Sequence, residues 1–235
     1  MLADIQFMIK NWAQWRKDED IDNIVVNPDF PFKDALLEAH PHGNHGVDKL
    51  GRPVWIDRVG VMSVEGLLAA CSLDDSFRYE YWDYEMQLRF RMPVCSILAG
   101  RKIQTGMNIV DLTEWQMSMF NRQVIGILKR CGQVMSDYYP ETMGATVVIN
   151  APFLFKGVWG IAKGFIDERT AAKFRITGAD YMETLEEFIE LDQIPKFLGG
   201  TCVCTNEGGC MRSEKGPWND YILVGNQVIR KDQQH

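Results

Sequence analysis

The sequence lacks a long apolar run. None of its segments approaches the roughly 18–20 consecutive apolar residues of a membrane-spanning helix, so we predict no membrane span. Its first residues, MLADIQ, include an early acid and no basic stretch, unlike a secretory signal. Internal repeats, low-complexity segments and an obvious linker are also missing. These absences predict one globular domain in the cytoplasm, and 235 residues suffice to bury a sizeable core.

Positive charge is scarce as well. Lys and Arg number 25 against 32 Asp and Glu, so the formal net charge is −7 and the pI is about 5.2. Domains that bind nucleic acid are generally basic, and we therefore expect no nucleic-acid partner. A local basic patch is compatible with this average.

The motifs of common enzyme sites are absent. The sequence contains neither a G-x-S-x-G nucleophile elbow nor a phosphate-loop lysine motif. Ser and Asp are plentiful, but their spacing indicates no catalytic set. We therefore expect no catalytic residues and no cofactor, and we do not expect an enzyme.

Spacings typical of metal sites are also missing. There is no Cys-x2-Cys pair, and one residue between Cys202 and Cys204 is a poor chelating spacing. His40, His42 and His45 lie close together, and we interpret them as part of a polar loop that leads to the next strand. The six scattered cysteines are expected to be reduced thiols. We predict no metal.

Flexible and aromatic apolar side chains are abundant, with 12 Met and 12 Phe. Methionine adapts its shape, so such a set suits a lining that receives more than one apolar ligand. The same residues also fill an ordinary core, and composition does not separate these interpretations.

Strand and helix patterns alternate along the chain. The apolar run at 147–149 is typical of a strand buried on both faces. A long helix is expected from Asp74 or Asp75, as its cap, to about residue 100, with a kink at Pro93. This alternation predicts an α/β fold with a mostly parallel sheet covered by helices. Further helices are expected at 2–17, 63–71, 115–137 and 153–165, and further strands at 54–59 and 103–112.

The helix expected at 153–165 is unusual for its glycines. Gly157, Gly160 and Gly164 form one stripe along it, although an interior glycine costs about 1 kcal/mol relative to alanine. Either backbones pack closely against the stripe, or the helix has to move and its apolar side chains then meet lipid. The segment is too short to span a bilayer, but it could dip into one surface.

Two polar groupings are compatible with an anion site. Thr170 and Lys173 are three residues apart and share a helix face, and a hydroxyl beside an ammonium suits a phosphate. Arg16 and Lys17 end the first helix, where they also satisfy the helix dipole. For both groupings the alternative is a solvated surface. Glu141 lies in the turn before a strand, and nothing local distinguishes it from the other acids.

Five short motifs together indicate a family. They resemble the CRAL-TRIO lipid-binding family, and within it the yeast-type phosphatidylinositol/phosphatidylcholine transfer proteins, over about residues 7–220. The resemblance implies a sheet floor under an apolar lipid cavity that a gating helix closes. The motifs are residues 48–54 (DKLGRPV), 138–144 (YYPETMG), 149–153 (INAPF), 194–200 (IPKFLGG) and 216–218 (GPW).

The resemblance also implies site residues. The gating helix corresponds to residues 153–166, and its representative side chains are Phe155, Val158, Trp159, Ala162 and Phe165. In the family's phosphoinositide-binding members, the headgroup contacts fall on positions that match Arg16, Lys17, Glu141, Thr170 and Lys173.

Two departures from the family pattern bear on the ligand. Thr142 stands where the yeast-type proteins have a basic residue, and Gly106 and Asn108 stand where hydroxyl side chains contact choline lipids. The second departure favours phosphatidylinositol over phosphatidylcholine.

The implied function is to hold one phospholipid and to exchange or present it during transient peripheral contact with a membrane. A lipid kinase or a small GTPase is an expected partner. The alternatives are another hydrophobic ligand, such as a sterol, a tocopherol-like molecule or another phospholipid, and a membrane-recruitment scaffold.

The resemblance divides the chain into three parts. Residues 1–30 match the end of the family's N-terminal helical lead, residues 31–220 the lipid-binding domain, and residues 221–235 a C-terminal tail. The earlier helices of that lead are not in this sequence, which is the pattern of a fragment or an incomplete gene model.

Overall fold

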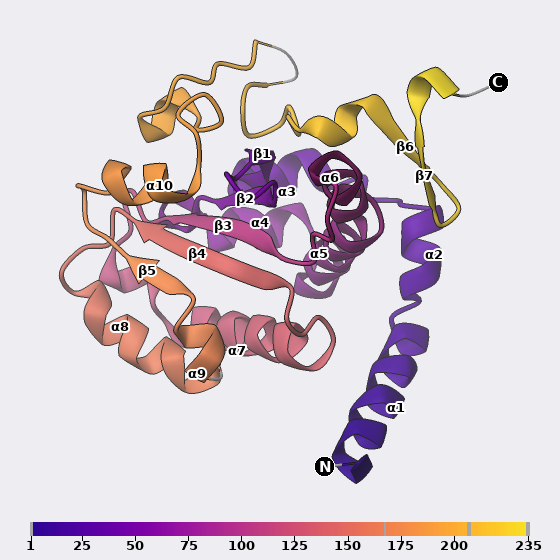
Figure 1. Ribbon diagram of the computed structural model, residues 1–235. Helices are drawn as coiled ribbons and strands as arrows, with labels where there is room; N and C mark the ends of the chain where they lie inside the picture. Colours follow the sequence, from indigo (N-terminus) through magenta and orange to yellow (C-terminus); the bar gives the residue numbers. More distant parts are fainter. Residues whose placement is uncertain (1, 167, 206–207, 234–235) are drawn as a thin grey trace.

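The computed structural model describes residues 2–166, 168–205 and 208–233 (Figure 1). A five-stranded sheet in the order β1-β2-β3-β4-β5 forms its centre. β1 is antiparallel to β2, and the other neighbouring strands are parallel, which confirms the predicted α/β fold. The strands are β1 (His42–Val47), β2 (Pro53–Asp57), β3 (Gly106–Asp111), β4 (Met143–Ile149) and β5 (Phe174–Ile176).

Helices lie on both faces of the sheet, with α7, α8 and α9 on one side and α10 on the other (Figure 1). Within the described residues, none of the helices combines the length and the apolar character needed to cross a bilayer. The α-helices are α1 (Leu2–Asp18), α2 (Ile21–Val26), α3 (Lys33–Ala39), α4 (Val64–Ala70), α5 (Leu73–Met86), α6 (Met92–Ala99), α7 (Arg122–Asp137), α8 (Phe155–Ala162), α9 (Glu168–Ala171) and α10 (Met182–Phe188).

Several helical turns depart from α geometry. The π-helical segment Gln87–Arg91 joins α5 to α6, and Pro93 lies in the first turn of α6. The irregularity expected at this proline is therefore a widened turn just before it. The 3₁₀ turns are Val59–Val61, Met117–Met119, Lys163–Phe165, Lys196–Leu198, Pro217–Asp220 and Lys231–Gln233.

One face of the sheet carries the main core. Alternate residues of a strand point to the same face, and on β2, β3 and β4 these are buried aliphatic residues and Met107. They pack against Leu185 of α10 and against Ile189, Ile194 and Leu198, which follow it. This packing fixes the sheet firmly from one side.

The opposite face is less completely covered. Trp55, Asn108 and Val110 project there by the same alternation, and each is only half-buried. Phe174 of β5 is paired with Thr146 of β4. α8 packs over this face, because Trp159 contacts Phe174 with ring centroids 4.7 Å apart. The space between the sheet and α8 therefore lies where the resemblance implies the lipid cavity.

α1 projects from the body of the protein, and its last turn is anchored (Figure 1). Trp15 is buried and stacks on Tyr138 with ring centroids 4.2 Å apart. The same indole meets Tyr139 edge-on. The end of α1 is thereby fixed to the turn that precedes β4.

Three local predictions are wrong. Residues 42–45 belong to the edge strand β1 and not to a loop, because they pair with β2. Ser72 caps α5 instead of either aspartate, since its hydroxyl accepts the Asp75 backbone N–H. α7 starts at Arg122 rather than near residue 115, because the Asn121 side chain caps the helix there.

The segment expected to be a C-terminal tail has regular structure. β6 (Tyr221–Val224) and β7 (Gln227–Arg230) pair as an antiparallel hairpin. Gly225 takes a positive φ of 60° in the turn, as tight hairpins require. Tyr221 and Val228 pack against a cluster that contains the buried Trp218.

Candidate functional site

Glu141 lies in an exposed and conformationally unusual position. It takes a φ of 59° in the turn between α7 and β4, a region that non-glycine residues seldom adopt. The Thr142 hydroxyl donates a hydrogen bond of 2.9 Å to the Tyr139 carbonyl and closes this turn. The Glu141 side chain is 81% exposed. The turn thus presents the carboxylate outward.

Lys173 lies just before the neighbouring strand β5 and contacts Glu141. Its Nζ lies 3.4 Å from Glu141 Oε2, and its carbonyl accepts the Thr146 N–H of β4. The backbone N–H of Lys173 donates to the Thr170 carbonyl at 3.0 Å, so Lys173 lies one turn beyond Thr170, at the end of α9. Parallel pairing of β4 with β5 therefore brings Glu141 and the segment Thr170–Lys173 to the same edge of the sheet.

Arg16 belongs to a buried charge network. Its guanidinium donates to Glu85 at 2.7 Å and to Asp22 at 2.8 Å, and Arg89 also contacts Glu85. The Tyr139 hydroxyl donates to the same Glu85 at 3.0 Å. Burial lowers the pKa of Arg16, but the hydrogen bonds to Glu85 and Asp22 outweigh it and raise the pKa above its usual value. Arg16 therefore acts first as a structural cation.

Arg16 and Lys17, two of the five predicted headgroup residues, thus form different contacts from the other three. Lys17 is exposed beside Arg16, and among the described residues no ion pair joins either cation to Glu141. The connection is indirect, through Trp15 stacked on the turn that carries Glu141. The structure brings Glu141, Thr170 and Lys173 together and places the end of α1 next to their turn.

The predicted gate corresponds to α8 and the following turn Lys163–Phe165. Val158 is 5% exposed, Trp159 packs on Phe174, and Phe155 meets Trp115 edge-on. Ala162 is half-buried, and the side chain of Phe165 lies outside the described residues. The predicted gate side chains that are described therefore face the body of the protein.

The outer side of the same segment is also apolar. Phe153 is 81% exposed, and Leu154 and Ile161 are at least half exposed. Lys156 and Lys163 are exposed among them. A short helix with exposed apolar residues and lysines is typical of segments that lie in a membrane interface.

The glycines of this helix have no close neighbours. A Cβ added at Gly157, Gly160 or Gly164 would meet no atom within 4 Å among the described residues. Close backbone packing therefore does not explain the stripe. The other interpretation, a helix that has to move, remains.

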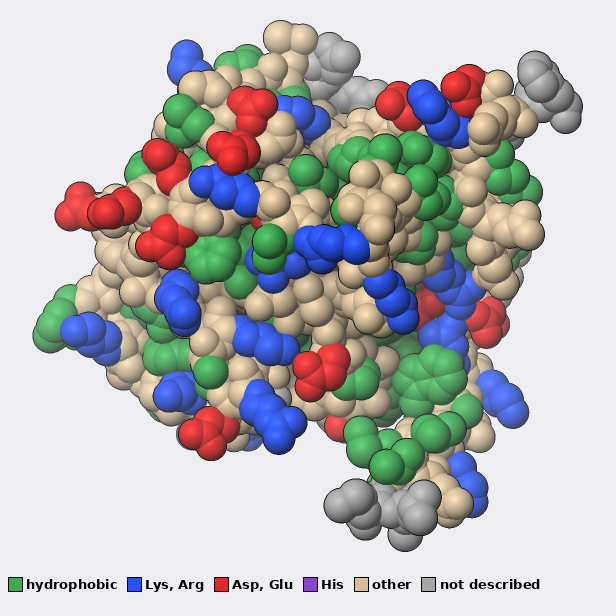
Figure 2. All heavy atoms as spheres, viewed as in Figure 1, with side chains coloured by type: hydrophobic (Ala, Val, Ile, Leu, Met, Phe, Trp, Pro, Cys, Tyr) green, Lys and Arg blue, Asp and Glu red, His purple; other side chains and the backbone are tan. Residues whose placement is uncertain are grey.

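Basic side chains gather on this face in spite of the acidic average. Figure 2 shows Lys and Arg side chains spread over the region of β5, α8 and α9. Lys156, Lys163, Arg169 and Arg175 are exposed there, and Lys173 is partly exposed. This local positive charge suits an anionic surface.

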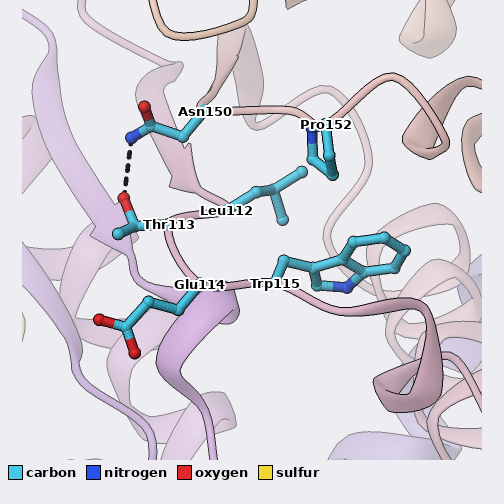
Figure 3. A pocket seen from close by; sticks show the side chains of 6 residues that line it. All are labelled: Leu112, Thr113, Glu114, Trp115, Asn150 and Pro152. Carbon is cyan, nitrogen blue, oxygen red and sulfur yellow. Dashed lines mark hydrogen bonds between the residues drawn. The ribbon is translucent and has the colours of Figure 1, made fainter.

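A hollow of about 300 Å³ opens near the start of α8 (Figure 3). Asn150 closes one side, and its amide donates to Thr113 Oγ1 at 2.8 Å and to Asp111 Oδ1 at 2.9 Å. The hollow lies just beyond the carboxyl ends of β3 and β4, where α/β sheets generally bind ligands. It is lined by Leu112, Thr113, Glu114, Trp115, Asn150 and Pro152.

Sequence reasoning missed a polar cluster between β1, β2 and α5. His40 Nε2 lies 2.7 Å from Asp57 Oδ1, and His42 Nε2 lies 3.3 Å from Glu80 Oε1. A second hollow, of about 210 Å³, borders His42. No local signal reveals this cluster, because its members come from β1, β2, α5 and the end of α3.

The ionisable groups of this cluster have pKa values shifted from their usual range. Burial raises the pKa of Glu80 to about 8 and lowers the pKa of His42 to about 3. Burial also lowers the pKa of His40, but the charge of Asp57 outweighs it and raises the pKa. Burial raises the pKa of Asp57, whereas His40 lowers it further, to below its usual value. Burial thus favours the protonated form of Glu80 near neutral pH, and the contact between His40 and Asp57 favours the charged form of each.

Among the residues that the structure describes, two groups of side chains have a composition that could hold a metal ion. His40, His42 and Glu80 form one, but the imidazole of His40 is already paired with Asp57. The second comprises His45, Cys202, Cys204 and Cys210. By strand alternation His45 points to the other face of β1 from His42, so the three neighbouring histidines serve two separate groups.

Comparisons with known proteins show the family of the chain. Residues 38–200 match the family model of the CRAL/TRIO domain. Over 223 residues the sequence is 38% identical to the phosphatidylinositol/phosphatidylcholine transfer protein SFH4 of Arabidopsis thaliana, covering 95% of this chain and 37% of that protein. It is 34% identical over 207 residues to the Sec14 cytosolic factor of Schizosaccharomyces pombe, covering 88% of this chain and 71% of that protein. The chain therefore spans less than half of the plant relative.

The fold has a solved counterpart. The crystal structure of Sfh5 matches with a TM-score of 0.61 and 17% identity, over 75% of this chain and 61% of that chain. At this identity the match shows a shared fold. The family model covers more than half of the sequence, and the fission-yeast relative is matched over most of its length. The chain belongs to the CRAL/TRIO domain family.

Proposed function

We propose that this domain binds one phospholipid, with phosphatidylinositol as the preferred ligand, and exchanges or presents it at a membrane surface. The observation that carries the proposal is the Glu141–Lys173 pair, which lies with Thr170 at the amino ends of β4 and β5. A lysine ammonium and a threonine hydroxyl suit the lipid phosphate, and a carboxylate accepts from inositol hydroxyls. The names of the relatives quoted above support the same ligand class.

The acyl chains require a dry compartment. Each CH₂ group withdrawn from a bilayer costs about 0.8 kcal/mol unless an apolar lining replaces the lipid. The half-buried sheet face under α8 offers such a lining. A hollow of about 300 Å³ is at the lower end of the range for small-ligand pockets, so two acyl chains enter only if α8 swings outward.

The outer surface of α8 supports contact with the membrane. Phe153, Leu154 and Ile161 provide exposed apolar area, and the surrounding lysines would attract anionic lipids. We propose that the domain acts from the cytoplasmic side through this transient peripheral contact, without catalysing a reaction. A lipid kinase or a small GTPase at the same membrane is a proposed partner.

The direct test uses the purified chain and vesicles of phosphatidylcholine that contain labelled phosphatidylinositol. We expect transfer of the labelled lipid to acceptor vesicles and a single co-purified phospholipid in native mass spectrometry. A sterol or a tocopherol-like molecule as the bound species would contradict the ligand assignment. A chain that holds no lipid but captures a GTPase or a kinase would favour a scaffold.

The glycine stripe gives a prediction about exchange kinetics. We expect the Gly157→Ala/Gly160→Ala variant to be about 1–2 kcal/mol more stable, because alanine is the better helix former. If α8 has to bend or unwind during exchange, the same free energy slows lipid exchange about 5- to 30-fold. Vesicle transfer rates and urea unfolding measure the two effects on one sample.

Gly126→Ala in α7 is the matched control. Gly126 is also exposed inside a helix, and a Cβ added to it would meet nothing within 4 Å among the described residues. It should raise stability without slowing exchange. Equal slowing by both variants would show that global rigidity, and not α8, sets the rate.

A further inference from the structure

Four side chains with metal-ligand chemistry converge beside the edge strand β1. One ligand atom each of His45, Cys202, Cys204 and Cys210 lies within 4.8 Å of every other. The sulfurs of Cys202 and Cys204 are 3.9 Å apart. All of these cysteines are free thiols. The group lies on the opposite side of β1 from the polar cluster of His40 and His42.

The imidazole of His45 is oriented as in metal sites. The residue is 1% exposed, and its Nδ1 lies 3.0 Å from the Cys210 carbonyl. Because that oxygen can only accept, Nδ1 carries the proton and Nε2 keeps its lone pair. Nε2 is buried and has no hydrogen-bond partner among the described residues. A buried acceptor without a partner is costly, and a metal ion would satisfy it.

The spacing of the group agrees with tetrahedral zinc. Zn–S bonds of about 2.3 Å and Zn–N bonds of about 2.0–2.1 Å place ligand atoms roughly 3.5–3.8 Å apart at tetrahedral angles. The 3.9 Å between the two sulfurs is close to this value. Histidine ligands commonly donate their second N–H to a backbone carbonyl, as His45 does to Cys210.

A lysine beside the group would balance the net charge of a zinc ion bound by three thiolates. Three thiolates and Zn²⁺ sum to one negative charge, and the Lys215 ammonium lies 3.1 Å from Cys202 Sγ. The same ammonium donates to the Asp192 carbonyl at 3.2 Å, which holds it in place. An ammonium that donates to a ligand sulfur is the kind of second contact that stabilises thiolates in metal sites.

We propose that His45, Cys202, Cys204 and Cys210 form a structural zinc site. Four protein ligands leave no open position, as in structural and unlike catalytic zinc sites. The ion would fasten the segment after Cys202 to β1, where the backbone adds the Gly46 N–H···Lys215 carbonyl bond. It would thereby cover the outer edge of the sheet, which otherwise invites pairing with another chain.

The fold explains why sequence spacing did not predict the site. One residue between Cys202 and Cys204 is unusual for zinc ligands, and His45 is distant in sequence. The link Pro195↔Cys202 and the bond from the Cys202 N–H to the Ile194 carbonyl bring the cysteines back to the sheet. Only this return places them beside His45.

The test measures metal in the full chain, expressed with zinc in the medium and purified under reducing conditions without a chelator. We expect about one zinc ion per chain. Cys204→Ser should lose most of it, because a serine hydroxyl is a poor zinc ligand, and Cys204 is only partly buried. Cys71→Ser is the matched control, since Cys71 is also partly buried but lies outside the group. It should keep the zinc.

Two further measurements use the wild-type chain, and the second adds Cys204→Ser as a reference. Cobalt added to the zinc-free wild-type chain should give the charge-transfer and visible bands of tetrahedral thiolate coordination. A chelator should lower the thermal unfolding midpoint of the wild type but not that of Cys204→Ser. The proposal is overturned by wild-type chain without metal, by iron in place of zinc, by a disulfide among the three cysteines under reducing conditions, or by full zinc content in Cys204→Ser.

Discussion

Replacing Glu141 and Lys173 together by alanine is expected to lower phosphatidylinositol transfer about 10- to 100-fold. A hydrogen bond to a charged group contributes about 1.5–3 kcal/mol, and each 1.4 kcal/mol corresponds to about a factor of ten in affinity. The fold should survive, because the Glu141 carboxylate is 81% exposed and exposed ion pairs contribute about 0–1 kcal/mol to stability. Vesicle transfer assays and urea unfolding give the two readouts.

A matched control exists on the opposite side of the sheet. Lys49 and Glu190 form another exposed pair, with 3.8 Å between Nζ and Oε1. Lys49→Ala/Glu190→Ala removes the same two charges, so it should leave transfer unchanged. If both double variants transfer phosphatidylinositol like the wild type, Glu141 and Lys173 do not bind the headgroup. If both lose transfer equally, the loss is not specific to Glu141 and Lys173.

Local patterns predicted the elements that local physics determines. The apolar run of β4 identifies a buried strand, and the helical spacing of apolar residues identifies α1, although Trp15 is the only buried apolar residue among those described in α1. The glycine stripe of α8 was visible for the same reason. β1 was missed, since HGNHGV has neither an apolar run nor an apolar/polar alternation. Its strand conformation comes from pairing with β2.

The site residues depended on longer-range information. Glu141 meets Lys173 only because β4 and β5 are parallel neighbours, and its positive φ is not a conformation that its residue type favours. The resemblance implied five headgroup positions, and the structure joins three of them, Glu141, Thr170 and Lys173. The resemblance could not reveal that the guanidinium of Arg16 donates to Glu85, 69 residues further on.

The second large expected effect is a loss of stability when the contact between Arg16 and Glu85 is removed. We expect Arg16→Ala to lower the free energy of unfolding by about 2–4 kcal/mol, because breaking a buried ion pair leaves an uncompensated charge. Glu85 is 3% exposed and Arg16 12% exposed in their side chains. Arg89 and Tyr139 still contact Glu85, which keeps the loss below the upper end of the range for buried pairs. Urea unfolding monitored by tryptophan fluorescence measures it.

Lys17→Ala is the control, since Lys17 carries the neighbouring charge of the same helix turn and is exposed. Its effect on stability should stay within about 0.5 kcal/mol, as for most surface substitutions. Arg16→Lys separates charge from geometry: lysine keeps the charge but cannot bridge Glu85 and Asp22 with a planar fork, so it should recover only part of the stability. An Arg16→Ala variant as stable as the wild type would show that the Glu85 network is not structural. If that variant also lost lipid transfer, the guanidinium would instead belong to the headgroup site.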